Sequence, residues 1–135
     1  MRSPWIPVVV WMGVIFWFSH QSGEESLAQS GVVLQVLEAL GLSKEHLRQP
    51  EFIFVVRKLA HFTEYFILGL LLSRVDLSFF WAAILILGYA VSDEIHQIFV
   101  PGRGFAIMDI GIDFLGGLTG MGLCFLWLSL KRSGV

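Results

Sequence analysis

The sequence predicts an all-α integral membrane protein, a four-helix bundle with a short amphipathic helix between its first and second spans. Hydrophobic residues make up 56% of the chain and charged residues only 15%, whereas soluble domains average about 25% charged residues. The mean hydropathy is +0.74. Four apolar segments, at about residues 4–20, 50–73, 77–100 and 106–130, are close to the length of about 20 residues that a membrane-crossing helix needs.

The rest of the composition narrows the class of protein. With 135 residues, the chain forms one domain over residues 1–135, because a second core would have too few residues. The net charge of −2 and the lack of a basic tract give no indication of a nucleic-acid partner. Cys124 is the single cysteine, which excludes an intrachain disulfide and a CxxC redox pair.

The first span, about residues 4–20, is a nearly pure apolar run from Trp5 to Phe18 that follows Arg2. A secretory signal peptide has the same shape, with a charged start and a short apolar core. However, the stretch FSHQSG after this run lacks the small-x-small pattern of a cleavage site. We therefore expect a helix that is retained in the membrane.

A polar connection from Glu24 to Glu51 separates the first two spans. Ser22 and Glu25 have the spacing of a capping box, which predicts that a helix begins there. Apolar residues then recur at helical spacing, at Val32, Val33, Val36, Leu37 and Leu40. This amphipathic helix is suited to lie on the membrane surface or to pack on the end of the bundle, and the sequence favours neither.

The second span, about residues 50–73, begins at Pro50, a residue suited to the first turn of a helix. It carries Arg57, His61 and Glu64 at positions i, i+4 and i+7, so these side chains share one helical face. Ionisable residues inside a membrane segment are rare and indicate a functional site.

The third span, about residues 77–100, is apolar from Phe79 to Val91 and polar afterwards. Its polar cluster consists of Ser92, Asp93, Glu94, His96 and Gln97, followed by a Pro101-Gly102 turn and Arg103. The apolar run covers only about 20 Å at about 1.5 Å per residue, less than the hydrocarbon thickness of about 30 Å. The cluster therefore lies at membrane depth, unless the bilayer is thinned and the polar ends are interfacial.

The fourth span, about residues 106–130, carries Asp109 and Asp113 near its start. Gly116 and Gly120 form a small-xxx-small pattern, which allows a neighbouring helix to approach closely. The face with Gly116 and Gly120 is also a candidate surface for oligomer formation.

The polar ends of the four spans are expected to meet. Antiparallel spans alternate in direction. One side of the membrane therefore contains the ends of the first and third spans and the starts of the second and fourth. A charge at membrane depth costs about 2.5–3.5 kcal/mol on insertion scales, and pairing in a shared cavity reduces that cost. We expect one polar pocket in one leaflet, lined by all four helices.

Lysine and arginine predict the orientation. With a cytoplasmic N-terminus, the inner side carries Arg2, Arg74, Lys131 and Arg132, and the outer side carries Lys44, Arg48 and Arg103. Positive charge is enriched on the cytoplasmic side of membrane proteins. Both termini are therefore expected to be cytoplasmic, and the pocket to face outward.

Four stretches resemble the VanZ-like family of membrane proteins: FSHQSG, RKLAHFTEY, SDEIHQIFVPGR and DIGIDFLGG, one for each span and in order. The family is named for a protein associated with low-level resistance to the glycopeptide teicoplanin. The resemblance therefore implies a protein of the bacterial cytoplasmic membrane that is linked to glycopeptide resistance. The family motif positions in this chain are His61, Glu94, Gln97, Arg103 and Asp109.

These residues are compatible with an enzyme that acts on a lipid-linked envelope precursor or a phospholipid. Carboxylates and histidines perform acid–base catalysis, so the candidate catalytic residues are Glu94, Asp109, His61 and His96. Phosphate is bound by basic and amide groups, arginine making bidentate contacts, so the candidate substrate-binding residues are Arg57, Lys58, Gln97 and Arg103.

Two other functions stay open. The charges can instead form an internal ion-pair network in a non-catalytic binding or assembly protein. A transporter is less favoured, because four short spans without paired broken helices give little basis for alternating access.

The expected pocket has more acidic than basic residues. The acids are Glu64, Asp93, Glu94, Asp109 and Asp113, and the bases are Arg57, Lys58 and Arg103. Because an unpaired buried charge is neutralised, a carboxylate keeps a proton, a histidine takes one, or a cation binds. Proton retention is favoured here, since no dense ligand motif such as HExxH occurs. A divalent metal is compatible with the residues, but none is assigned.

The orientation is tested by tagging each terminus in turn. Both tags should be protected in intact cells and become labelled only after the membrane is permeabilised, because the basic residues that flank the first and fourth spans favour the cytoplasm. Labelling of either tag in intact cells would reverse the assignment.

Overall fold

The computed structural model describes residues 3–132. Over this range the chain forms six helices and no strand: α1 (Trp5–Ser19), α2 (Gly23–Ala39), α3 (Lys44–Leu47), α4 (Pro50–Leu72), α5 (Phe79–Gln97) and α6 (Ile107–Arg132). The all-α prediction is confirmed. Each predicted span forms one helix, and the amphipathic helix between the first two is α2.

Two of these helices, α5 and α6, are long and apolar enough to cross a membrane. Helix α1 is apolar but has only 15 residues. Helix α4 has 23 residues and carries Glu51, Arg57, Lys58 and Glu64. Length and composition therefore identify α5 and α6 as the candidate spans.

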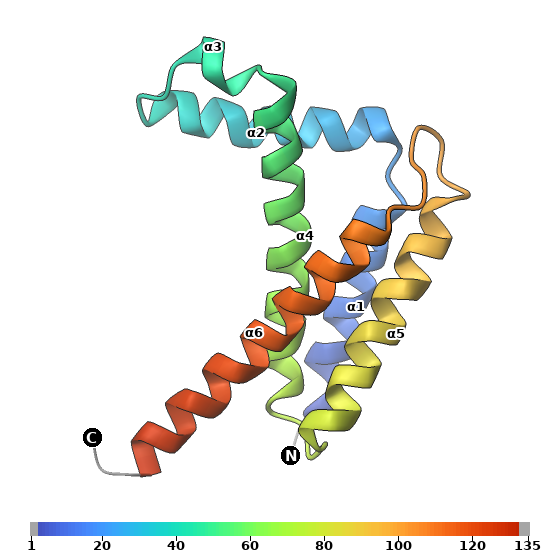
Figure 1. Cartoon of the computed structure of the whole chain (residues 1–135), viewed down its shortest axis with the longest axis vertical. Helices are drawn as coiled ribbons and strands as arrows, with labels where there is room; N and C mark the ends of the chain where they lie inside the picture. The colour runs from blue at the N-terminus through green and yellow to red at the C-terminus, as the bar shows by residue number, and fades with distance from the viewer. Residues whose placement is uncertain (1–2, 133–135) are drawn as a thin grey trace.

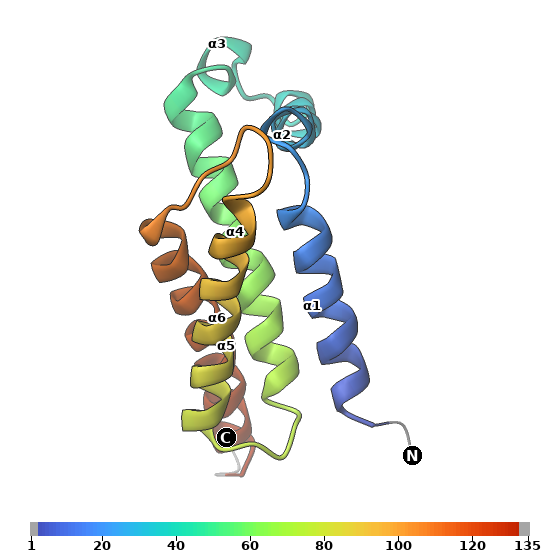
Figure 2. The same cartoon turned by 90° about the vertical axis from the view of Figure 1, so that its right-hand side faces the viewer.

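The helices α1, α4, α5 and α6 run side by side, and α6 tilts away from the others towards its end (Figures 1 and 2). Helices α1 and α5 run towards α2, whereas α4 and α6 run away from it. The polar ends of the four helices consequently lie at the end where α2 crosses, and α1 begins and α6 ends at the other (Figure 1).

The start of α2 is fixed by a cap and by a close contact between backbones. The predicted capping box is confirmed: the Ser22 side chain accepts from the Glu25 backbone N–H, and the Glu25 carboxylate accepts from the Ser22 backbone N–H. The Gly23 N–H donates to the Pro101 carbonyl oxygen at 3.0 Å. A Cβ on Gly23 would lie 2.5 Å from the Gly102 oxygen, so only glycine allows α2 to meet the α5–α6 loop this closely.

The most extensive contact between helices is that of α4 with α6. Glycines bring the two backbones together: a Cβ on Gly116 would lie 2.4 Å from the Phe62 oxygen, and one on Gly120 would lie 2.2 Å from the Phe66 oxygen. On α4, a Cβ on Gly69 would lie 2.1 Å from the Gly117 oxygen. The neighbour that the glycine pattern admits is thus α4 of the same chain, and it occupies the face considered for oligomer formation.

The apolar core lies below the polar ends and joins all four long helices. It contains Val8, Ile15, Tyr65, Leu68, Leu72, Val75, Ala82, Ile86, Ala90 and Met121. Two hydrogen bonds attach α1 to this core. The Tyr89 hydroxyl donates to the Met12 carbonyl oxygen at 2.6 Å, and the Trp11 Nε1–H donates to the Glu64 carbonyl oxygen at 2.8 Å.

Replacing Gly120 with alanine should separate α4 from α6. The new Cβ would collide with backbone atoms of Phe66, which no side-chain rotation relieves, so we expect a loss of about 1–3 kcal/mol of stability, the usual range for overpacking. Unfolding of the purified protein in detergent measures it. The matched control is Gly122→Ala on the same helix, where a Cβ meets nothing within 4 Å. Equal stability of the two variants would contradict the proposed role of the glycine contact.

Candidate functional site

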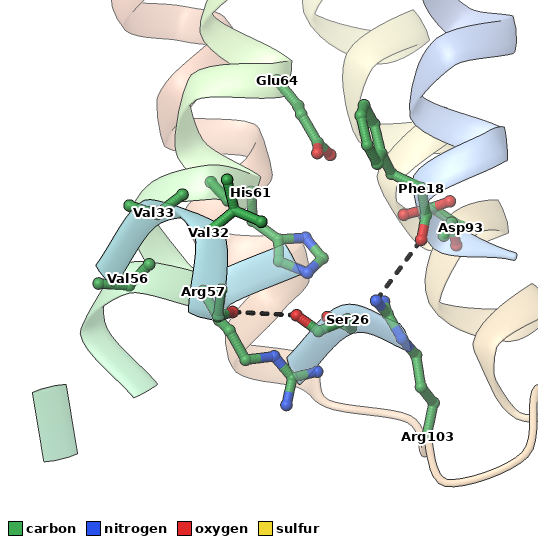
Figure 3. A pocket seen from close by; sticks show the side chains of 13 residues that line it. Phe18, Ser26, Val32, Val33, Val56, Arg57, His61, Glu64, Asp93 and Arg103 are labelled. Carbon is green, nitrogen blue, oxygen red and sulfur yellow. Dashed lines mark hydrogen bonds between the residues drawn. The ribbon is translucent and has the colours of Figure 1, made fainter. Parts of the chain in front are cut away.

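A pocket of about 440 Å³ lies between α2 and the polar ends of α1, α4 and α5, and we call it the α2 pocket (Figure 3). Its ionisable residues are Arg57, His61, Glu64, Asp93 and Arg103. The helix α2 contributes Ser26, Ser30, Val32 and Val33. Polar residues of three helices and a loop therefore face one cavity, which α2 covers with a mixed polar and apolar wall.

Two arginines of this pocket have no acidic partner. Neither Arg57 nor Arg103 forms a salt bridge with any residue that the structure describes. Arg103 Nη2 donates to the Phe18 carbonyl oxygen at 3.5 Å, and its Nε is buried without a hydrogen bond. Burial, and then the nearby Arg57 cation, lowers the pKa of the Arg103 guanidinium. The site therefore holds positive charge that a bound anion would stabilise.

A second cavity of about 500 Å³, the α6 pocket, shares Arg57 and Arg103 with the first. Its other polar residues are Lys58, Gln97 and Asp109. The Lys58 ammonium pairs with the Asp109 carboxylate and so joins α4 to α6. The sequence predicted a single pocket, but the two arginines line two adjoining ones.

An apolar groove of about 630 Å³ adjoins the α2 pocket. The two cavities share Val33, Val56, Ala60 and Glu64. The groove continues between α2 and α4 along Leu37, Leu42, Phe52, Val55, Leu59, Thr63 and Ile67, with Trp11 of α1 at its side. A charged cavity is thus connected to an apolar one.

Two candidate catalytic residues lie outside these cavities. The buried Glu94 accepts from the Ala106 backbone N–H through Oε2 at 2.7 Å, just before α6 begins. At the start of a helix, a carboxylate hydrogen-bonds a free backbone N–H and interacts favourably with the helix dipole. This hydrogen bond holds α5 to the start of α6, and the other carboxylate oxygen, Oε1, is buried without a hydrogen bond. His96 lies with its Nε2 3.2 Å from His20 Nδ1 and lines none of the three cavities.

The other candidates are distributed over the site. His61 lines the α2 pocket, Asp109 and Lys58 line the α6 pocket, and Gln97 donates to the Ser19 hydroxyl at 3.2 Å, which joins α5 to α1. The polar ends thus come together as the sequence indicated. However, His61, Glu94 and Asp109 each contact a different partner within the described chain, rather than one another.

Three carboxylates at the site, namely Glu64, Asp93 and Asp113, were expected among the acids of the pocket but were not named as candidate catalytic or substrate-binding residues. Helical spacing holds a signal for each: Glu64 follows His61 by three residues, Asp93 precedes Gln97 by four, and Asp113 follows Asp109 by four. The sequence holds no such signal for the pocket residues that α2 contributes, because the position of α2 depends on how Gly23 packs against the α5–α6 loop.

The capping box makes the stability of α2, which forms one wall of the α2 pocket, depend on pH. The hydrogen bond from the Ser22 backbone N–H lowers the pKa of Glu25 below its usual value of 4.5. The stabilisation is therefore complete above about pH 4.5 and is lost as the pH falls through the lowered pKa. Glu25→Gln should reduce thermal stability at neutral pH, and its difference from the unaltered protein should vanish in acid.

Glu24→Gln is the matched control, because Glu24 is an exposed neighbour outside the capping box. A stability difference for Glu25→Gln that stays constant from neutral to acidic pH would contradict the assignment.

Comparison with known proteins identifies a family. The VanZ/LLP1 family model matches residues 5–128, which includes the α2 pocket, the α6 pocket and the apolar groove. No curated protein and no solved structure matches the chain.

Proposed function

The chain belongs to the VanZ/LLP1 family, and from this premise we propose that it binds the phosphate group of a membrane lipid in the α2 pocket. The ligand class is a lipid-linked envelope precursor or a phospholipid. A lipid-linked precursor of the cell envelope would connect the site to the glycopeptide resistance for which the family is named.

We place the protein in the bacterial cytoplasmic membrane with α1, α4, α5 and α6 crossing it, both termini inside and the α2 pocket towards the outer side. Only 28% of the most apolar window of α5, and the same share in α6, is buried, unlike a core helix of a soluble protein. The large apolar side chains left exposed on these two helices include Phe79, Phe80, Trp81, Ile84, Leu87, Leu123, Phe125, Leu126 and Trp127. Lipid is the solvent that suits such a surface.

The observation that carries the phosphate assignment is the pair of arginines without acidic partners. A guanidinium binds phosphate oxygens through bidentate, charge-assisted hydrogen bonds. Arg57 comes from α4 and Arg103 from the α5–α6 loop, and Figure 3 shows both side chains at the same side of the pocket. Two cations from separate elements can hold one anion between them.

The adjoining groove indicates a lipid rather than a soluble phosphate. Because the groove is almost wholly lined by apolar side chains and shares Val33, Val56 and Ala60 with the pocket, a hydrocarbon chain can leave the pocket along α4 without meeting water. Burial of a chain contributes about 0.8 kcal/mol per CH₂ group. An amphipathic ligand therefore gains from both cavities at once.

Acid–base groups lie beside the proposed phosphate. His61, Glu64 and Asp93 line the same pocket as the two arginines, and His and carboxylate side chains transfer protons in reactions of phosphate esters. This arrangement supports a reaction on the bound lipid, with these three residues rather than Glu94 and His96 at the reacting end.

The binding proposal is tested by titrating the full chain in detergent with a polyprenyl phosphate and with a phosphatidic acid, following tryptophan fluorescence. Arg57→Gln and Arg103→Gln should each weaken binding about 10- to 100-fold, since a hydrogen bond to a charged group contributes about 1.5–3 kcal/mol. Inorganic phosphate should bind far more weakly than either lipid. The control Arg74→Gln removes an exposed charge in the α4–α5 turn and should leave the affinity unchanged. Equal affinity of all four proteins would refute the phosphate site.

A non-catalytic protein with a structural ion-pair network is the second candidate function. The Lys58–Asp109 pair and the contact of His61 with Asp113 favour it, because both join α4 to α6. Under this alternative, Lys58→Gln would lower the unfolding temperature because it removes the pair with Asp109, and Arg57→Gln and Arg103→Gln would leave lipid affinity unchanged.

A further inference from the structure

Three side chains from three helices meet next to the α2 pocket. One donor atom each of His61 on α4, Asp93 on α5 and Asp113 on α6 lies within 4.8 Å of the other two. We propose that these residues bind a divalent transition-metal ion, of the class of Zn²⁺ or Mn²⁺. The metal site would share His61 and Asp93 with the α2 pocket, where a metal ion would take the place of their acid–base role, but metal binding does not require a bound lipid.

The first support is a buried carboxylate whose oxygens accept no hydrogen bond. The Asp113 side chain has no exposed surface, and neither of its oxygens accepts a hydrogen bond. Buried carboxylates in proteins are nearly always hydrogen-bonded, paired or bound to a metal. Protonation would remove the charge, but it would leave the oxygens without hydrogen bonds.

The second support is the relation of Asp113 to His61. Asp113 Oδ1 lies 3.3 Å from His61 Nδ1, yet the two atoms are not aligned for a hydrogen bond and both lack a partner. A nitrogen and an oxygen that share one Zn²⁺ at about 2.1 Å each would be about 3.4 Å apart at a tetrahedral angle. The pair therefore has the separation of two ligands of one ion.

Asp93 supplies the third ligand from the pocket side. Its side chain is buried, and its carboxylate accepts from Gln97 Nε2 at 3.5 Å and from the Ser19 hydroxyl. Ligand atoms that lie within 4.8 Å of one another need to move by at most about 1.4 Å to reach the separation of about 3.4 Å that a common ion requires. Gln97 is itself held by Ser19, so the carboxylate is positioned through α1 as well as α5.

Arg57 and Arg103 line the same pocket, but the carboxylates of the cluster itself favour a cation. Lys58, the ammonium nearest in sequence to His61, pairs with Asp109, and Glu64 adds a further carboxylate to the pocket. A cation bound at the cluster would neutralise Asp93 and Asp113 together and use the oxygens that hydrogen bonds leave free. One imidazole with carboxylates suits Zn²⁺ and Mn²⁺ better than Ca²⁺, which takes oxygen ligands alone.

The position of the cluster defines what such an ion would contact. His61 and Asp93 line the α2 pocket, whereas Asp113 lies behind them. Three protein ligands leave a coordination position for water or for a ligand oxygen, as in catalytic zinc sites, and this position would face the cavity that contains Arg57 and Arg103.

The test uses the full chain, purified in detergent, stripped with EDTA and titrated with ZnCl₂, MnCl₂ or MgCl₂ in the absence of lipid. We expect one equivalent of Zn²⁺ or Mn²⁺ to bind and to raise the unfolding temperature, with Mg²⁺ much weaker. Asp93→Asn and Asp113→Asn should each weaken metal affinity at least tenfold. The matched control Asp76→Asn alters an exposed aspartate in the α4–α5 turn and should bind as the unaltered protein does.

A further variant separates this site from the close pair of imidazoles formed by His20 and His96. His96→Gln should keep the affinity and the stoichiometry. Loss of binding in His96→Gln with full binding in Asp113→Asn would overturn the proposal, as would the absence of a stoichiometric metal. Because Arg57→Gln and Arg103→Gln leave the three ligands intact, they should still bind metal, so failure of the lipid site and failure of the metal site give different results.

Discussion

The close packing of the α4 and α6 backbones, which glycines permit, positions the rest of the site. The contact at Gly69, Gly116 and Gly120 leaves no room for a Cβ on either helix, so it fixes how far apart the two helices lie and how they are rotated. Both helices run in the same direction (Figure 1), so residues that precede the contact on one helix face residues that precede it on the other. Asp109 and Asp113 precede the glycines on α6, as Lys58 and His61 precede Gly69 on α4, and these residues form the two pairs between the helices.

The remaining elements are attached to this pair of helices by polar groups rather than by apolar packing alone. Glu94 holds α5 to the start of α6 through the Ala106 N–H, and Gln97 holds it to Ser19 of α1. The Pro101 carbonyl oxygen of the α5–α6 loop then accepts from the Gly23 N–H, and this contact positions α2 over the polar ends. Such hydrogen bonds gain strength where water is excluded, so one end of the bundle is ordered by polar contacts and the other by its apolar core.

The periodicity of apolar residues was sufficient to predict the helices. The alternating direction of consecutive helices was sufficient to predict that their polar ends meet. The capping box at Ser22 was readable because it depends on two residues of the same segment. Rotation of a helix about its axis was not readable, because it depends on which partner the glycine face meets. The sequence therefore did not show that α4 of the same chain meets this face. A sequence also does not distinguish a carboxylate in a cavity from one that accepts from the backbone before the next helix, as Glu94 does. The two pockets could not be predicted because both include Arg103 of the α5–α6 loop, whose position is a long-range feature of the fold.

Polar groups with and without partners occur together at the site. Lys58, Asp109 and Gln97 have partners and hold helices together, whereas Glu94 accepts from Ala106 through one oxygen and leaves the other without a hydrogen bond. Arg57 and Arg103 have no acidic partner in the part of the chain that the structure describes, and the Asp113 oxygens have no hydrogen bond. A buried polar group without a hydrogen bond costs about 1–3 kcal/mol, and Arg103 Nε and both Asp113 oxygens are such groups. The two proposals, an anion at the arginines and a cation at the carboxylates, would each supply a partner that the described chain does not.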